Sequence, residues 1–495
     1  METRRFGDDS LLFYIAVAFL LFMMVFNLTH SSPWGDEWVE YTISQKSIRN
    51  GDMYRAIINT FQPPLYNFLM HFWLKIGKSV LWFRMFNVLC GAVSGICIYK
   101  SLKNMTTPLL AAGVVCSMGA TYRWIYCIQE CSEYALMLMF LCISLYYYIK
   151  INERNRTLDE IIFILACVGG MYSQYGAFFI VFPLLIAHLI KKCLAKEKRK
   201  IWNTAVMYLF ALAFFALPLY MLFAKKQLEH NRISENSNII ISLKDIKNFF
   251  SVIGRLIGYF FDVNDRWMFG NFMEFVGIST VIAGVILLIK KTTPWLLKSL
   301  VSVLLSAYII HYWLVIFHIY AMVHPNQSAG FYGRYSYFYM PIFYLSIPTI
   351  WYEIICSMKN RLFAKWTIRG AVFGVIAIIL TAYPELLSNW HKTYDQDFAK
   401  IWLHNGGFQE TTYLIGMAEY GFEYYTAPYA YELKGTVLSS DDIDLEDLPN
   451  AFWLWRTNWG GDKWNETVET AIEQGYEVMI YADYGDPGQL AYCIK

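Results

Sequence analysis

Charged residues are scarce in this sequence. They make up 16% of the 495 residues, whereas 57% of the residues are hydrophobic and 18% are aromatic. A soluble domain usually carries about 25% charged residues, so this composition excludes an ordinary cytosolic enzyme and a disordered scaffold. The basic residues are dispersed between apolar runs and do not gather on one face, which argues against a nucleic-acid partner.

Several common catalytic motifs are absent as well. The sequence contains no G-x-x-x-x-G-K-[ST], no H-E-x-x-H and no G-x-S-x-G, which leaves phosphate-loop, zincin and hydrolase-elbow chemistry without support. Most of the 10 cysteines lie inside apolar runs and are interpreted as small core residues. Cys127 and Cys131 stand one helical turn apart, but no histidine or second cysteine pair is near them in sequence, so packing is favoured over a metal site.

What the sequence does have is a series of long apolar runs. A hydrocarbon core about 30 Å thick requires about 20 apolar residues per helix. The eleven candidate spans are approximately 11–29, 80–99, 106–120, 132–149, 158–169, 175–190, 203–223, 272–289, 292–320, 335–356 and 370–384. The first run lacks a small-residue cleavage site and is expected to remain as an anchor. The sequence therefore predicts an all-α polytopic membrane bundle of about 11 transmembrane helices.

The distribution of basic residues predicts the orientation of this bundle. With the N-terminus in the cytoplasm, the internal loops hold 19 Lys and Arg in 49 residues, whereas the external loops hold 14 in 128. The positive-inside rule predicts such a contrast. We therefore expect a multi-pass protein of the cell membrane, with the segment after the last span on the extracytoplasmic side.

The first external loop, 30–79, contains two further helical patterns. Apolar and aromatic residues recur at helical spacing from Asp36 to Ile48, as in a helix that lies along a membrane surface. A second pattern runs from Leu65 to Ile76 and follows Pro63-Pro64, which the first turn of a helix tolerates. This loop is expected to form a helical shelf on the bilayer.

Residues 385–495 have a different character. Short helical and strand-like patterns alternate there, which is typical of a small α/β domain. This part carries 19 Asp and Glu against 6 Lys and Arg, whereas the preceding part carries 20 against 35. We expect a transmembrane module at 1–384 and a C-terminal extracytoplasmic α/β domain at 385–495.

Polar residues collect at the expected external ends of the spans. Asp36 and Glu37 lie between Trp34 and Trp38, just beyond the first span. A solvated helix start with interfacial tryptophans is the simplest interpretation of that stretch. Other external ends are polar too, at Gln129-Glu130, Ser173-Gln174-Tyr175 and Gly333-Arg334-Tyr335. Ionisable groups at that depth are costly unless they face a protein cavity, which makes this set a candidate site.

In this combination the sequence resembles the GT-C membrane glycosyltransferases, in particular the bacterial group related to protein O-mannosyltransferases and lipid A aminoarabinose transferases. The resemblance covers roughly residues 10–385. The motifs that carry it are Asp36-Glu37, Gln62-Pro63-Pro64-Leu65-Tyr66, His71 to Lys75, Arg84, Gln129 to Leu136, Tyr172 to Tyr175, and Gly333-Arg334-Tyr335 with Pro341. Where the group usually has Gln-Glu-x-Arg and Thr-His-Tyr, this chain has Ser132 in the Arg position and Ser173-Gln174-Tyr175.

The resemblance implies an inverting transfer of a sugar from a polyprenyl-phosphate donor to an extracytoplasmic hydroxyl on a glycolipid, a cell-wall polymer or a protein. Asp36 matches the catalytic acid of the family and would act as general base. Arg334, with Arg84 or Arg123, would hold the departing phosphate. Glu37 would orient the substrate or the helix, and Glu130 would accept a sugar hydroxyl or tune the base. The remaining candidate substrate-binding residues are Trp34, Trp38, Tyr66, His71, Gln129, Gln174, Tyr175 and Tyr335.

Two other functions stay open from the sequence. A transporter or flippase for lipid-linked sugars would use the same polar cleft, although neither paired repeats nor broken mid-membrane helices are evident. The Ser132 and Gln174 departures give some weight to a catalytically silent envelope scaffold. No cofactor is expected. Asp36, Glu37 and Glu130 offer oxygen ligands for Mg²⁺ or Mn²⁺, but the family that the chain resembles generally works without a metal.

Overall fold

The computed structural model describes most of the chain. The described residues are 5–29, 32–33, 35–154, 156–195, 198–230, 253, 256–257, 260, 267–316, 336–358, 366–370, 374, 395–416, 418–426, 434–439, 442–457, 461–483 and 488–495. Contacts divide the chain into two compact units. The membrane unit comprises Met1–Phe26, Ile43–Gly77 and Trp82–Leu386, and the sheet unit comprises Asn27–Thr42, Lys78–Leu81 and Leu387–Lys495.

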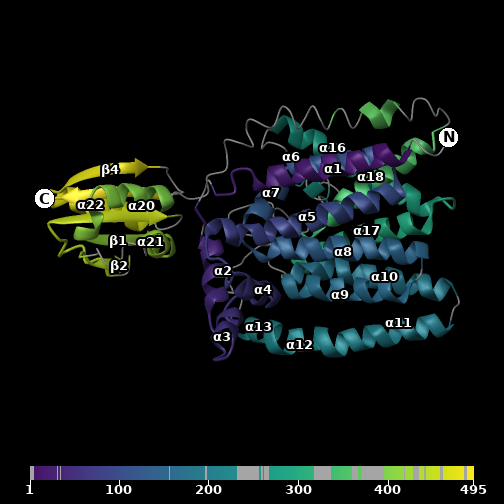
Figure 1. Ribbon diagram of the computed structural model, residues 1–495, viewed down its shortest axis with the longest axis horizontal. Coiled ribbons are helices and arrows are strands. Elements are labelled where there is room, and N and C mark those ends of the chain that lie inside the picture. Colours follow the sequence, from purple (N-terminus) through teal and green to yellow (C-terminus); the bar gives the residue numbers. More distant parts are fainter. Residues whose placement is uncertain are drawn as a thin grey trace. The chain divides into compact units, whose positions relative to one another are not determined.

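The membrane unit is built from helices, of which the long ones run roughly along a common direction (Figure 1). They are α1 (Arg5–Val25), α3 (Asp52–Ile58), α4 (Leu65–Trp73), α5 (Val80–Met105), α6 (Pro108–Ala120), α7 (Tyr122–Gln129), α8 (Glu133–Arg154), α9 (Thr157–Ser173), α10 (Phe178–Leu194), α11 (Lys198–Ala211), α12 (Leu217–Leu219), α13 (Lys225–His230), α16 (Trp267–Ile289), α17 (Trp295–Ile316) and α18 (Tyr339–Cys356). Helix α2 (Gly35–Gln45) begins in the sheet unit and ends in the membrane unit.

Among the described residues, five helices are long and apolar enough to cross a membrane: Val80–Met105, Glu133–Arg154, Tyr175–Leu194, Ile201–Glu229 and Trp295–Leu314. Each predicted span from 11–29 to 335–356 falls on a described helix. The last predicted span, 370–384, lies outside the described residues apart from positions 370 and 374. The mostly helical membrane architecture is therefore confirmed, whereas the count of eleven spans stays a prediction.

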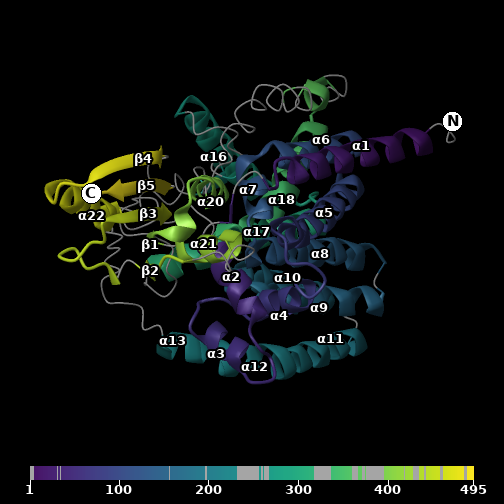
Figure 2. The same ribbon diagram turned by 60° about the vertical axis from the view of Figure 1, so that its left-hand side comes forward.

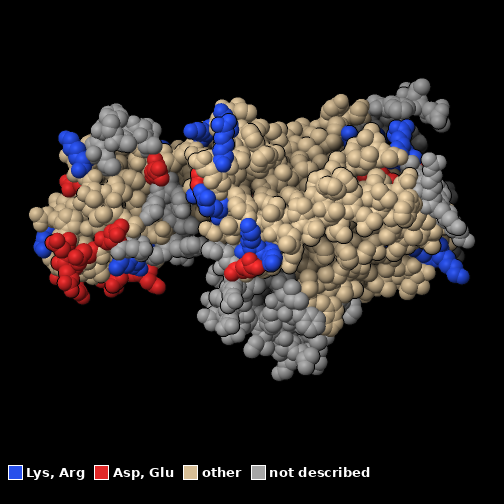
Figure 3. Space-filling model, turned by 90° about the horizontal axis from the view of Figure 1, so that it is seen from below, with Lys and Arg blue, Asp and Glu red and all other residues tan. Residues whose placement is uncertain are grey.

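Small residues let α1 and α5 approach closely. A Cβ added to Gly95 would come within 2.3 Å of Leu20 Cδ2, and one added to Gly91 would come within 2.6 Å of Met24 Sδ. Helix pairs in membranes use small residues in this way, because lipid provides little hydrophobic driving force between helices. On the outside, Leu209, Phe214 and other large side chains of the segment 198–230 are exposed. Figure 3 shows a broad surface of the membrane unit without charged side chains, as contact with lipid requires.

A buried charged cluster lies where α9, α10 and α11 converge. Glu160 Oε2 lies 3.3 Å from Lys192 Nζ, and Glu160 Oε1 accepts a hydrogen bond of 2.6 Å from Thr204. His188 Nδ1 lies 2.6 Å from the hydroxyl of Tyr208 in the same cluster. Burying a charge is costly unless it is paired and hydrogen-bonded, and this carboxylate is both.

The described part of the sheet unit contains a five-stranded sheet of order β2-β1-β3-β5-β4 (Figure 2). Its elements are α20 (Asp395–His404), β1 (Thr411–Gly416), α21 (Ala418–Thr426), β2 (Val437–Ser439), β3 (Ala451–Thr457), α22 (Gly461–Glu473), β4 (Glu477–Asp483) and β5 (Gly488–Ile494). Strands β2, β1 and β3 are parallel, whereas β5 pairs antiparallel with β3 and β4. The expected small α/β architecture is observed.

Alternation along β3 divides the core of this unit between the two faces of the sheet. Trp453 and Trp455 pack with residues of α20 and α21, and Phe452 and Leu454 pack with Trp464 of α22. Acidic side chains gather over the outside of the unit (Figure 3). The sequence pattern missed only the short strand β2 among the described strands.

Candidate active site

The acidic pair lies in the first turn of α2. The helix begins at Gly35, and Asp36 and Glu37 follow directly. Negative charge is favourable there, because the first turn presents unpaired backbone N–H groups. Asp36 is half-buried, whereas Glu37 is 0% exposed. The partly exposed carboxylate of Asp36 thus lies next to the fully buried carboxylate of Glu37 in the sequence.

Sequence reasoning missed a third acid on this helix. Glu40 is 1% exposed, and it follows Glu37 by three residues, so these two acids share one face of α2. The spacing of three residues between Glu37 and Glu40 could have predicted that they share a helix face. Adjacent residues on a helix point about 100° apart, so Asp36 projects in a different direction from Glu37.

Trp38 packs against helix α21 of the sheet unit. Its side chain is 2% exposed. The ring centroid lies 4.9 Å from that of Tyr424 and 6.3 Å from that of Tyr425. Tyr41 is 5.9 Å from Tyr424 by the same measure. The ring of Trp38, which was predicted to contact substrate or membrane, therefore contacts tyrosine rings of the protein itself.

Two hydrogen bonds secure the same part of the sheet unit. The backbone N–H of Gln396 donates to Ser32 Oγ at 2.9 Å, and the hydroxyl of Tyr424 donates to the backbone oxygen of Lys78 at 3.1 Å. Ser32 and Trp38 thus attach the start of α2 to α20 and α21. The position of Asp36 therefore depends on the sheet unit.

Glu130 lies at a break between α7 and α8. Helix α7 ends at Gln129, and Glu130 has an extended backbone with φ −82° and ψ 128°. The side-chain amide of Asn87 on α5 donates to the backbone oxygen of Glu130 and, at 3.1 Å, to that of Ser132. Glu130 is 0% exposed. This break is fixed by a buried amide that sequence reasoning also missed.

Gln129 is engaged with the end of α1. Its Nε2 donates to the backbone oxygens of Met24 and Phe26, both at 2.9 Å. The last carbonyls of a helix have no partner within the helix, so this side chain caps α1. The amide nitrogen of Gln129 is therefore used to stabilise the end of α1.

Arg84 and Tyr66 are both buried in the membrane unit. Arg84 lies on α5 and is 2% exposed, and Tyr66 lies on α4 and is 0% exposed. The ring of Tyr66 meets Phe86 edge-on, with centroids 5.8 Å apart. Arg123 is half-buried near the start of α7. Arg84 is thus the more enclosed of these two predicted phosphate ligands.

His71 connects α4 to the end of α2. Its Nδ1 lies 2.8 Å from the backbone oxygen of Ser44. A carbonyl oxygen only accepts, so Nδ1 carries a proton in this contact. Asn67 Nδ2 donates to Ser44 Oγ at 3.4 Å on the same helix face. The two helices predicted for the first external loop are therefore joined.

Gln174 and Tyr175 form a short junction between α9 and α10. The side-chain oxygen of Gln174 accepts a hydrogen bond from the backbone N–H of Gly176 and caps the 3₁₀ turn Tyr175–Ala177. The hydroxyl of Tyr175 donates to Gln227 Oε1 at 2.7 Å. Gln227 Nε2 donates in turn to the backbone oxygens of Ile57 at 2.9 Å and Gln62 at 2.7 Å. Gln227 was not identified from the sequence.

The predicted residues thus fall into three sets. Asp36 and Trp38 belong to the sheet unit, as does Glu37. Tyr66, His71, Arg84, Gln129, Glu130, Gln174 and Tyr175 belong to the membrane unit. Trp34, Arg334 and Tyr335 lie outside the described residues. Within the part of the chain that the structure describes, no three His, Cys, Asp or Glu side chains form a metal-binding group.

Comparison with known proteins identifies the fold. Residues 61–221 match the family model for dolichyl-phosphate-mannose-protein mannosyltransferase. No curated protein sequence matches the chain. ArnT from Cupriavidus metallidurans bound to undecaprenyl phosphate has a TM-score of 0.54 and 10% identity over 99% of this chain and 98% of its own. The apo state of the same protein has a TM-score of 0.53 and 10% identity over 98% of each chain.

A third solved structure is the oligosaccharyltransferase of Archaeoglobus fulgidus in complex with Zn and sulfate. Its TM-score is 0.51, with 11% identity over 97% of this chain and 72% of its own. At such low identity the likeness shows the fold. The resemblance indicated by the sequence motifs is confirmed at that level: the chain has the GT-C fold of membrane glycosyltransferases related to protein O-mannosyltransferases and ArnT.

Proposed function

We propose that this chain is an inverting glycosyltransferase that moves a sugar from a polyprenyl phosphate to a hydroxyl acceptor at the membrane, with Asp36 as general base. The observation that carries the proposal is the half-buried carboxylate of Asp36 in the first turn of α2, beside the enclosed Glu37, in a chain of GT-C fold. A base must be reachable by the acceptor and shielded enough to exclude competing water.

In the proposed step, Asp36 takes the proton of the acceptor hydroxyl as its oxygen attacks the anomeric carbon of the donor. The bond from that carbon to the phosphate oxygen breaks, and the electron pair leaves with the polyprenyl phosphate. Attack opposite the leaving group inverts the anomeric centre. The leaving phosphate requires positive charge, for which we propose Arg84 and Arg334, with Arg123 as a further donor. The undecaprenyl phosphate bound to the ArnT structure supports a lipid phosphate as donor.

The other predicted residues receive roles according to their contacts. Gln129 and Gln174 are proposed to position the site, because their side chains hold the backbone of α1 and of the 3₁₀ turn. Glu130 is proposed as an acceptor for sugar hydroxyls. We propose that Tyr66, His71 and Tyr175, together with Trp34 and Tyr335, line the substrate path.

Membrane placement of the site is also part of the proposal. Loop charges favour an extracytoplasmic shelf and sheet unit. We propose that residues 1–384 carry the catalytic module and that 385–495 form an outer domain. Its contacts to Ser32 and Trp38 support a role in holding the catalytic helix.

The test is turnover by the full chain in proteoliposomes, with radiolabelled polyprenyl-phosphate sugars and an envelope extract as acceptor. Asp36→Asn keeps the shape but removes the basic oxygen, and loss of a general base costs about 10² to 10⁴ in rate. The matched control is Asp397→Asn, an exposed acid in the first turn of α20 whose surface ion pair with Lys400 contributes little. Full turnover by Asp36→Asn would falsify the mechanism. Donor translocation without transfer would instead indicate a transporter.

A further inference from the structure

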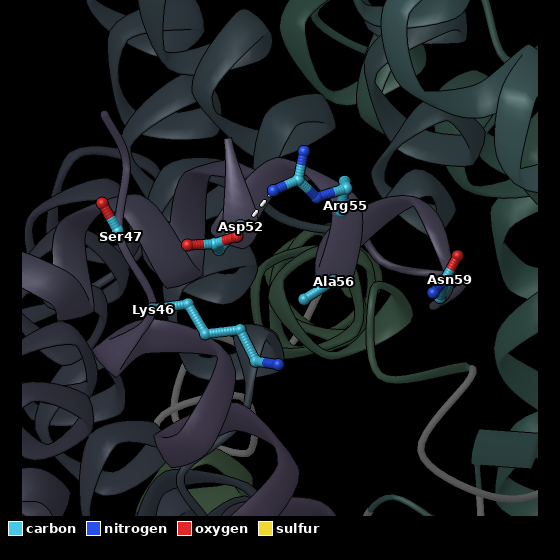
Figure 4. A pocket seen from close by; sticks show the side chains of 6 residues that line it. All are labelled: Lys46, Ser47, Asp52, Arg55, Ala56 and Asn59. Atoms are coloured by element: carbon cyan, nitrogen blue, oxygen red, sulfur yellow. Dashed lines mark hydrogen bonds and ion pairs between the residues drawn. The ribbon is translucent and has the colours of Figure 1, made fainter. Parts of the chain in front are cut away.

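The segment between α2 and α4 in the membrane unit contains a polar pocket that shares no residue with the candidate active site. Its volume is about 340 Å³, and Lys46, Ser47, Asp52, Arg55, Ala56 and Asn59 line it (Figure 4). Lys46 and Ser47 follow the end of α2, and the other lining residues come from α3 and its C-terminal cap. Pockets that bind small molecules typically begin at about 300 Å³, so this one has room for a phosphate-bearing head group.

Hydrogen-bond donors dominate the pocket. Asp52, the one carboxylate among the described residues that line the pocket, is paired with Arg55 through an Oδ1 to Nη2 distance of 2.6 Å. Arg55 also donates to the backbone oxygen of Asn50 at 3.1 Å, and no bond to its Nη1 or Nε appears among the described residues. The side chains of Lys46 and Asn59 have no hydrogen-bond or ion-pair partner among the residues that the structure describes.

The hydroxyl of Ser47 adds a further donor. Ser47 Oγ accepts from the backbone N–H of Asn50 at 3.3 Å, which leaves its hydrogen for another acceptor. Two cations against one carboxylate leave the pocket net positive, and the carboxylate is already paired. This balance disfavours a divalent cation and favours an anion whose oxygens accept several hydrogen bonds.

The wall formed by α3 is held from outside the pocket. The hydroxyl of Tyr54 donates to the backbone oxygen of Leu222 at 2.9 Å, and Lys226 Nζ lies 2.7 Å from the same hydroxyl. Met53 and Ile57 are buried on the opposite side of the helix. The donors therefore stand on a supported surface, which reduces the ordering cost of binding.

We infer that this pocket binds a phosphate-type oxyanion, with Lys46 and Arg55 as the charged ligands and Ser47 and Asn59 as neutral donors. Lys46 supplies a point charge, and the unused edge of the Arg55 guanidinium supplies directed N–H groups. The anion is either the head group of a phospholipid or a free phosphate, since both present the same oxygens. The inference stands on the pocket alone and does not require transferase activity.

The experiment uses the purified full chain in a maltoside detergent and a phosphate-free buffer. One arm measures binding of radiolabelled inorganic phosphate by equilibrium dialysis, and the other measures retention of phosphatidylglycerol against phosphatidylcholine by native mass spectrometry. We expect saturable binding in at least one arm, weakened about tenfold by Lys46→Gln and by Arg55→Gln, in line with the loss of one charge-assisted hydrogen bond. Binding of phosphate alone identifies a soluble anion, and selective retention of phosphatidylglycerol identifies a lipid.

Two further variants separate binding from misfolding. Asp52→Asn removes the competing carboxylate and is expected to tighten binding several-fold, which a damaged fold would not do. Arg49→Gln removes an exposed cation of the same loop that does not line the pocket, and it should leave binding unchanged. Absence of saturable binding in both arms, or an equal loss in Arg49→Gln and Lys46→Gln, would overturn the inference.

Discussion

The side-chain amide of Asn87 donates hydrogen bonds to the backbone oxygens of both Glu130 and Ser132. One buried side chain on α5 thus satisfies two carbonyls at the point where the helical ladder between α7 and α8 is interrupted. A buried carbonyl without a partner is costly, so this amide stabilises the irregular backbone that carries Glu130.

Replacing Asn87 with Leu is expected to destabilise the chain by about 1–3 kcal/mol for each carbonyl left without a donor. If Glu130 contacts the sugar as proposed, KM should rise as well, because the segment around Glu130 loosens. Thermal unfolding in detergent and steady-state kinetics measure the two effects. Asn104→Leu is the control, since Asn104 lies on the same helix but is exposed. Equal stability of the two variants would contradict this role.

Gln227 joins the membrane helices to the turn before α4. Gln227→Leu removes donors to Ile57 and Gln62 and an acceptor for Tyr175, so hydrogen exchange of residues 57–64 should accelerate. Tyr175→Phe removes one of these bonds and should give a smaller change. Mass spectrometry of deuterated peptides reports both. Unchanged exchange in Gln227→Leu would show that Pro63 and Pro64 set the turn alone.

Replacing Tyr424 tests the proposal that α21 holds the start of α2, which carries Asp36. Tyr424→Ala removes the ring beside Trp38, and loss of such an aromatic pair costs about 1 kcal/mol beyond buried area. Turnover should fall, because the start of α2 is less well held. Tyr424→Phe keeps the ring and removes the bond to Lys78, so it should retain most activity. Wild-type turnover and α2 protection in Tyr424→Ala would refute the link.

Burial also raises the pKa of Tyr424 above 10.0, despite an opposing hydrogen bond to the backbone at Val80. The unfolded phenol therefore loses its proton first as pH rises. The stability that this group contributes is complete below pH 10.0 and declines above it. In Tyr424→Phe, the free energy of unfolding should therefore fall less steeply above pH 10.0 than in the wild type.

Cys493 on β5 provides a reporter for the sheet unit. Burial raises the pKa of its thiol from 9.0 to about 12, so the reactive thiolate is suppressed in the folded state. At pH 8 a maleimide should label the exposed Cys193 and Cys356 within minutes, and should label Cys493 only after denaturation. Peptide mass spectrometry distinguishes the sites. Early labelling of Cys493 would show that β5 opens readily.

Periodicity and composition predicted much of this fold. The apolar runs predicted the membrane helices, and the strand-like run from Ala451 to Trp455 predicted β3, whose residues are buried on both faces of the sheet. Helix α3 was missed because it is 7 residues long and buries only Met53 and Ile57. Strand β2 has 3 residues and is too short to show a period.

Span 203–223 is less regular than its hydropathy suggests. The turns Leu212–Ala216 and Tyr220–Ala224 are π-helical and flank Pro218. Proline removes a backbone donor and clashes with the preceding turn, so the ladder widens locally. A proline within an apolar run predicts where a helix departs from α-helical geometry. It does not predict whether the helix kinks, breaks or widens into π-helical turns.

The candidate site was predictable in part. Acidic residues beside aromatics marked Asp36 and Glu37, and family motifs marked Glu130. Asn87 and Gln227 were missed because their side-chain amides donate to backbone carbonyls, which every position of the sequence provides equally. A single polar residue in an apolar helix gives no indication of where its bonds lead.

The convergence of Glu160, Lys192 and Thr204 limits how this protein can change. Replacing Glu160 alone would remove an anionic partner of the buried Lys192 ammonium, and replacing Lys192 alone would remove the cationic partner of the buried Glu160 carboxylate. A neutral, well-packed pair introduced in one step avoids both penalties. Homologous chains should therefore keep these two positions or exchange them jointly, and engineers who randomise one of them should randomise the other in the same library.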